Sequence, residues 1–224
     1  MTGDTADAYD ASPYVPAGAD LRTLAGAAAC CRGCPLYRAA TQTVFGEGDA
    51  HAHVMLVGEQ PGDQEDRQGR PFVGPAGRVL ERALTEAGIG PGRTYITNAV
   101  KHFKFTVTGA GKRRIHKPPS LREVSACKPW LAAEMRVVRP RLIVALGATA
   151  GRALLGPSFR VSERRGVPVP FPGDAPGPWR QAMGDAEAYL VATIHPSAVL
   201  RAEDRDAMYA GLLSDLRSAA GLLT

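Results

Sequence analysis

Five short apolar runs alternate with helical patterns along the chain, and this alternation restricts the possible folds more than any other feature. The segments 54–57, 94–97, 142–146, 167–169 and 189–193 are predicted strands, and the segments 21–29, 76–87, 121–138, 149–155 and 206–223 are predicted helices. Strands that alternate with helices tend to pair in parallel and to be covered on both faces. The sequence therefore predicts an α/β fold with three layers, α/β/α, around a mainly parallel central sheet.

The length of the chain suits one domain with a substantial core. With 224 residues it is too short for two domains of ordinary size. We expect one domain over residues 21–224, preceded by a flexible N-terminal tail over residues 1–20, which are small, polar and proline-containing. The segment 168–178 holds five prolines and is predicted to be an exposed loop.

A glycine-rich, acidic loop directly follows the strand predicted at 54–57. It runs from Gly58 to Gly74 and contains two prolines and Phe72. In open α/β sheets ligands bind at the carboxyl ends of strands, where a rigid scaffold positions the loops. We therefore expect this loop to form part of a binding site. Its acidic residues are Glu59, Asp63, Glu65 and Asp66.

The formal net charge of +5 is compatible with a polyanionic partner without requiring one. Clustering of the charge at Lys112, Arg113, Arg114 and Lys117 favours phosphate binding by this segment. No apolar run approaches the roughly 20 residues of a membrane span, and the acidic N-terminus lacks the pattern of a secretory signal. These features predict a cytoplasmic protein with no membrane partner.

The cysteines are unevenly distributed, with Cys30, Cys31 and Cys34 close together and Cys127 far along the chain. In a reducing compartment such a group indicates metal or redox chemistry rather than a structural disulfide. The spacing Cys31-x-x-Cys34 is compatible with half of a zinc site, a redox pair or half of an iron–sulfur site. The cysteines alone leave these three alternatives open.

Residues 58–77 follow the pattern G-E-x-P-G-x-x-E-D-x-x-G-x-P-F-V-G-x-A-G, which resembles the first active-site motif of the iron–sulfur uracil-DNA glycosylases. His195-Pro196-Ser197 resembles their second motif. Two features are more similar to the UdgX subgroup than to family 4 proper: Gln60 in place of a glycine, and the string K-R-R-I-H-K-x-P that begins at Lys112. The resemblance extends from about Cys31 to the last predicted helix. It implies a uracil-DNA glycosylase-like fold.

The resemblance also implies a 4Fe-4S cluster with a structural role. Family members complete the site with one cysteine after a T-N-x-V-K segment and another before P-W-L or P-F-L. Cys127 matches the second position, whereas the first is His102, and histidine can ligate cluster iron. The implied ligands are Cys31, Cys34, His102 and Cys127. Cys30 is the competing choice for the fourth ligand.

For the base, the resemblance implies a closed pocket that receives a uracil flipped out of DNA. Phe72 would supply an aromatic face, and the Asn98 amide could pair with the uracil edge. His195 would donate a hydrogen bond to the departing base, and Glu59 and Asp66 are the first choices for stabilising positive charge on the sugar. The implied substrate-binding residues are Gln60, Asp63, Phe72, Asn98 and Arg114, with Arg114 on a phosphate near the flipped nucleotide.

In the UdgX subgroup, the histidine that matches His116 attacks C1′ after uracil leaves. The resemblance therefore implies that the protein excises uracil once, releases it as free base and stays covalently attached to the DNA through His116. We expect a monomer that acts on single-stranded DNA, with double-stranded DNA as a second substrate. The alternatives are a family 4 glycosylase that turns over, a non-catalytic iron–sulfur binding module and, less favoured, a small electron carrier.

Overall fold

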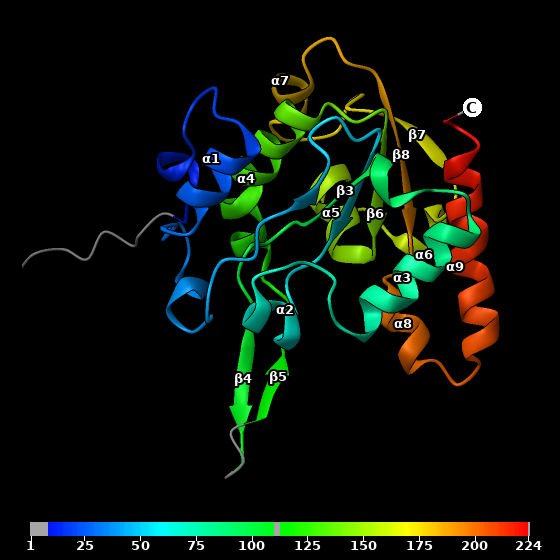
Figure 1. Cartoon of the computed structure of the whole chain (residues 1–224), viewed down its shortest axis with the longest axis horizontal. Helices are drawn as coiled ribbons and strands as arrows, with labels where there is room; N and C mark the ends of the chain where they lie inside the picture. Colours follow the sequence, from blue (N-terminus) through cyan, green and yellow to red (C-terminus); the bar gives the residue numbers. More distant parts are fainter. Residues whose placement is uncertain (1–8, 110–112, 224) are drawn as a thin grey trace, which may run out of the picture.

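The computed structural model describes residues 9–109 and 113–223, and its centre is a six-stranded sheet with the order β1-β3-β2-β6-β8-β7 (Figure 1). The four inner strands β3, β2, β6 and β8 are parallel, whereas β1 and β7 pair antiparallel at the edges. The strands of this sheet are β1 Glu47–Gly48, β2 Val54–Gly58, β3 Thr94–Asn98, β6 Leu142–Leu146, β7 Pro168–Phe171 and β8 Ala188–Thr193. The predicted α/β fold with a mainly parallel central sheet is confirmed.

Helices cover both faces of this sheet, and the alternation of side chains along β2 explains why. Met55 and Val57 point into a core with α1, α4, α5 and α7, whereas Val54 and Leu56 point into a second core with α3, α8 and α9. The helices are α1 Leu21–Ala28, α2 Asp63–Gln68, α3 Pro75–Glu86, α4 Leu121–Val138, α5 Ala148–Leu155, α6 Val161–Arg164, α7 Trp179–Met183, α8 Pro196–Arg201 and α9 Arg205–Ala220.

The long helix α4 has the predicted bounds at both ends. The Ser120 side chain accepts the backbone N–H of Glu123, and the Glu123 carboxylate accepts the N–H of Ser120, so a capping box fixes the start. Arg139 ends the helix in a left-handed conformation. In the part of the chain that the structure describes, no helix combines the length and apolar character that a membrane crossing requires.

Three segments differ from the prediction. Residues 9–20, expected in a flexible tail, pack on α4: the Ala11 N–H donates to the Ala126 carbonyl, and the Tyr9 ring lies under the Arg122 guanidinium. The segment 168–178 starts as strand β7 rather than as a loop, and its Phe171 is buried. The glycine-rich acidic loop contains the short helix α2, which begins at Asp63.

A two-stranded hairpin, β4 Phe105–Thr108 and β5 Arg113–His116, projects from the body of the protein below α2 (Figure 1). The sequence predicts a basic segment here and no strands, but the described residues form an antiparallel pair in which Phe105 lies opposite His116. Lys112, part of the predicted basic cluster, lies outside the described residues. The hairpin places His116 at its base, next to the sheet.

Candidate active site

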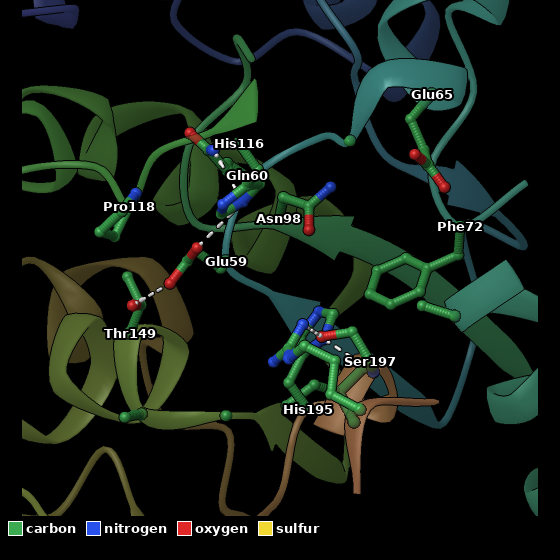
Figure 2. A pocket seen from close by; sticks show the side chains of 16 residues that line it. Glu59, Gln60, Glu65, Phe72, Asn98, His116, Pro118, Thr149, His195 and Ser197 are labelled. Atoms are coloured by element: carbon green, nitrogen blue, oxygen red, sulfur yellow. Dashed lines mark hydrogen bonds and ion pairs between the residues drawn. The ribbon is translucent and has the colours of Figure 1, made fainter. Parts of the chain in front are cut away.

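The carboxyl ends of β2, β3, β6 and β8 border a pocket of about 590 Å³ (Figure 2). The strand register places Gly58 opposite Asn98 and Leu146 opposite Thr193, so the residues that follow these strands converge. The pocket gathers six of the predicted site residues: Glu59, Gln60, Phe72, Asn98, His116 and His195.

Glu59 is held between two side chains (Figure 2). The Thr149 hydroxyl donates a hydrogen bond to its Oε2, and its Oε1 lies 3.3 Å from Nε2 of His116. Burial raises the pKa of Glu59, but the hydrogen bonds from His116 and Thr149 outweigh it and hold the pKa below its ordinary value. Glu59 is therefore an anion at neutral pH, directed at a His116 side chain that is 48% exposed and open to a ligand.

Gln60 connects the pocket to the base of the hairpin. Its Oε1 accepts the Lys104 N–H at 3.1 Å, and its Nε2 lies 3.2 Å from the Lys104 carbonyl and 3.0 Å from the Lys117 carbonyl. The same nitrogen is 2.9 Å from Nε2 of His116. Because the carbonyls can take both amide hydrogens, His116 can keep an Nε2 proton for Glu59. Gln60 is predicted to bind substrate, but in this structure its side-chain amide binds the backbone on both sides of the hairpin that carries His116.

Asn98 and Phe72 form the inner wall of the pocket. Among the described residues, the buried Oδ1 of Asn98 has no hydrogen-bond partner, which is costly unless a ligand donates to it. Phe72 adopts a φ of 55°, uncommon for an aromatic residue, and its ring stacks on that of His195 with centroids 5.9 Å apart. Gly58 keeps the wall open, because a Cβ there would lie 2.7 Å from Cζ of Phe72.

His195 follows β8 and caps α8. The Ser197 N–H donates to its Nδ1 at 3.2 Å, and the Ser197 hydroxyl lies 2.8 Å from the same nitrogen. A nitrogen that accepts a backbone N–H carries no proton, so the ring proton lies on Nε2. Burial lowers the pKa of His195 to about 4. His195 is therefore a neutral hydrogen-bond donor in the pocket across the physiological pH range.

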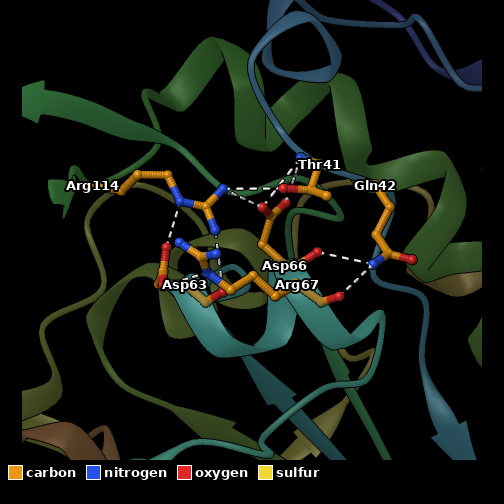
Figure 3. Close-up of polar contacts among 6 residues, drawn as sticks. All are labelled: Thr41, Gln42, Asp63, Asp66, Arg67 and Arg114. Carbon is orange, nitrogen blue, oxygen red and sulfur yellow. Dashed lines mark hydrogen bonds and ion pairs between the residues drawn. The ribbon is translucent and has the colours of Figure 1, made fainter. Parts of the chain in front are cut away.

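Asp66, Asp63 and Arg114, which are predicted to act on substrate, are not among the residues that line the pocket. Arg114 instead contacts both carboxylates (Figure 3). Asp66 is fully buried, accepts the Thr41 N–H at 3.0 and 3.1 Å, and lies 2.6 Å from Nη1 of Arg114. Arg114 Nε also pairs with Asp63. This guanidinium is 12% exposed and already paired with two carboxylates, so a phosphate would compete with both pairs. The three residues instead fasten the hairpin to α2.

Three of the four predicted cluster ligands lie in one region. Cys31, Cys34 and Cys127 are buried free thiols that act electrostatically on one another, and burial raises the pKa of Cys34 and, to about 12, that of Cys127. The Trp130 indole N–H donates to Cys31 Sγ at 3.2 Å. Cys30 is exposed. Cysteine thiolates are the ligands that iron–sulfur clusters prefer. Within residues 9–109 and 113–223, however, no three His, Cys, Asp or Glu side chains are arranged to hold a metal ion.

His102 is held by Thr43, because its Nε2 lies 2.9 Å from the Thr43 hydroxyl, which also donates to the Ala28 carbonyl. Burial lowers the pKa of His102 to about 4, so the ring is neutral. Neighbouring Lys101 is buried and pairs with Glu134 at 2.6 Å, so its ammonium group does not face solvent. The described residues therefore supply three neighbouring thiols and a buried, neutral histidine bonded to Thr43, but no assembled metal site.

Sequence reasoning missed three residues of the pocket. Thr149, near the start of α5, holds Glu59. Glu65, an acidic loop residue for which no role is predicted, accepts the Gly74 N–H at 2.8 Å and so links α2 to the start of α3. Arg201 lines the pocket and donates a hydrogen bond to the Ser197 hydroxyl. The available signal for Thr149 was its place just after β6, at the same sheet edge as Glu59.

Comparison with known proteins agrees with this geometry. The family model described as the uracil DNA glycosylase superfamily matches residues 45–217. A type-4 uracil-DNA glycosylase of Pyrobaculum aerophilum is 37% identical over 172 residues, covering 76% of this chain and 80% of that protein. Corresponding enzymes of Thermotoga maritima (35%) and Sulfurisphaera tokodaii (31%) align with 76% of the chain and with 78% and 71% of their own lengths. The chain therefore belongs to the uracil DNA glycosylase superfamily.

Proposed function

We propose that this protein excises uracil from DNA and is then captured by the sugar through His116. The observation that carries the proposal is the position of His116 at the mouth of the pocket, 3.3 Å from the anionic Glu59 and held there by Gln60 through the hairpin base. Family membership and the type-4 names of the relatives support the excision step. The capture step rests on this local geometry and on the resemblance to the UdgX subgroup.

The pocket has the groups needed to hold a flipped uracil. The unpartnered Oδ1 of Asn98 can accept the uracil N3–H, and its amide N–H can donate to O4. The Phe72 ring supplies an apolar face. The Nε2–H of His195 is the donor for O2, where negative charge develops as the base departs.

In the cleavage step, the C1′–N1 bond breaks and its electron pair leaves with uracil, which later takes a proton at N1. The sugar gains oxocarbenium character, and the Glu59 carboxylate provides the nearby negative charge. In the capture step, a lone pair of the His116 imidazole bonds to C1′. The resulting imidazolium then loses its remaining N–H proton to Glu59 or water, leaving an N-alkylated ring that is a poor leaving group.

We also propose that Cys31, Cys34 and Cys127 hold a 4Fe-4S cluster with a structural role, with His102 or Cys30 as fourth ligand. The gathering of three buried thiols supports this proposal. Iron and acid-labile sulfide content of the anaerobically purified protein, together with its visible absorption spectrum, tests it. Protein that is folded but contains neither iron nor sulfide would refute it.

The experiment that tests the proposed function is denaturing gel electrophoresis after incubation with a labelled, uracil-containing oligonucleotide, first single-stranded and then double-stranded. We expect a slow band that survives SDS and heat and is absent when thymine replaces uracil. His116→Ser should release uracil and leave free DNA with an abasic site. If the unmodified protein leaves alkali-sensitive free DNA and no slow band, it is a glycosylase that turns over. Intact DNA would refute both steps.

A further inference from the structure

Arg201 is the last residue of α8 and reaches back along the helix to the His195 motif. Its Nη1 lies 3.0 Å from the Ser197 hydroxyl, and that hydroxyl lies 2.8 Å from Nδ1 of His195. All three side chains line the same pocket. Arg201 is four positions after Ser197, which places both on one face of the helix.

The donors and acceptors of these side chains fix the direction of each hydrogen bond between Arg201, Ser197 and His195. A guanidinium has only donors, so the Ser197 oxygen accepts from Arg201. The Ser197 hydroxyl hydrogen is then free to point at Nδ1 of His195, which also accepts the Ser197 backbone N–H at 3.2 Å. Two donors directed at Nδ1 fix the ring proton on Nε2, the nitrogen available to a bound base.

We infer that Arg201 is a positioning residue for the departure of the base, acting through Ser197 on His195. This inference rests on the proposed excision of uracil. The positive charge of Arg201 opposes protonation of the ring and polarises the Ser197 hydroxyl, so the Nε2–H becomes a stronger donor as negative charge develops on uracil O2. Arg201 needs no direct contact with the substrate for this role.

A competing role for an exposed arginine at the mouth of a DNA-binding pocket is a phosphate contact. The two roles differ in what they respond to. An effect through His195 depends on how much hydrogen-bond stabilisation the departing base anion requires. The effect of a phosphate contact depends on the salt concentration and is the same for every base. Single-turnover rates on oligonucleotides that contain uracil or 5-fluorouracil separate them, because fluorine makes the departing anion more stable.

We expect Arg201→Gln to slow uracil release roughly tenfold, less than the 10²–10³ of losing a direct donor, and 5-fluorouracil release about twofold. Ser197→Ala should show the same pattern. The double variant should be no slower than Ser197→Ala, because both changes interrupt one chain of contacts. Arg205→Gln, which removes an equal charge from the neighbouring start of α9, is the matched control and should leave both rates unchanged.

Equal losses for both bases, multiplicative effects in the double variant, or a reduced salt dependence of DNA binding in Arg201→Gln would overturn the inference. A measurement without substrate keeps it independent of the proposed function. NMR titration should show a higher pKa for the His195 ring in Arg201→Gln than in the unmodified protein. Glu59 and His116, the other ionisable residues that act on the ring, are kept in this variant. If the unmodified protein releases no uracil, the proposed function fails, and an unaltered His195 titration would then refute the Arg201 contact separately.

Discussion

Replacing Arg114 with methionine tests whether the buried ion pair with Asp66 fastens the hairpin. The change leaves the Asp66 carboxylate fully buried, with the Thr41 N–H as its remaining partner at 3.0 and 3.1 Å. Leaving one charge of a buried pair without its partner costs about 3–5 kcal/mol. Since Arg114 is 12% exposed and the Asp63 side chain is 41% exposed, we expect a loss of about 2–3 kcal/mol in the free energy of unfolding.

Urea unfolding followed by tryptophan fluorescence measures this loss, because Trp130 and Trp179 are both buried. Asp66→Asn keeps an oxygen for Thr41 and removes the stranded charge. The double variant with Arg114→Met should therefore be more stable than the sum of the two single losses predicts, by at least about 1 kcal/mol.

Arg113→Met is the matched control, because Arg113 is the exposed neighbour on the opposite face of β5, and its change should cost less than about 0.5 kcal/mol. Arg114→Met should also lower covalent capture more than uracil release, since His116 lies two residues further along the same strand. An Arg114→Met variant as stable as the control, or strictly additive losses, would refute the fastening role.

Further predictions concern the pocket and its titration. Thr149→Val should raise the pKa of Glu59 by removing a hydrogen bond to the carboxylate, and pH–rate profiles should show the acid limb displaced upward; an unmoved limb would contradict this contact. Gly58→Ala should abolish uracil release while the protein stays folded, because the new Cβ lies 2.7 Å from Cζ of Phe72; normal release would show that the pocket is not used as proposed. The pKa of His195 in the folded protein is about 4, below the ordinary 6.5, so the unfolded chain binds the proton first on acidification. The neutral His195 ring therefore contributes fully to the free energy of unfolding above pH 6.5, and up to about 3 kcal/mol of this contribution is lost as the pH falls towards 4. The His195→Gln variant should lose less stability than the unmodified protein over this pH range in urea titrations. An equal loss in both proteins would contradict the shifted pKa.

The sheet and the main helices could be predicted because their signals lie within short stretches of sequence. β2 and β6 are buried along their whole lengths and are written as continuous apolar runs. The capping box of Ser120 and Glu123 marks the start of α4, even though Pro129 lies inside the helix.

The hairpin could not be predicted in the same way, because distant residues hold it. Gln60 binds backbone groups at positions 104 and 117, and Asp66 pairs with Arg114 across 48 residues of sequence. Its own strands are partly exposed, with Val107 at 56%, and so lack a clear alternation of apolar and polar residues.

Asp63 and Asp66 were predicted to act on substrate because helix α2 was not predicted. Once this segment is a helix, Asp63 and Asp66, three residues apart, share one face and meet Arg114, while Glu65 turns towards the pocket. Counting acidic residues in a loop cannot make that distinction. Arg201 was missed for the same reason, since its link to Ser197 requires a six-residue helix that is too short for a periodic signal.

Covalent capture by His116 is tested most directly by counting uracil released per protein molecule with DNA in large excess. Capture predicts that release stops at one equivalent, and that the mass of the recovered protein has increased by the oligonucleotide less uracil, with the modification on the peptide containing His116. His116→Ser should continue past one equivalent under the same conditions. Linear release beyond one equivalent by the unmodified protein, with its mass unchanged, would contradict capture and leave a glycosylase that turns over.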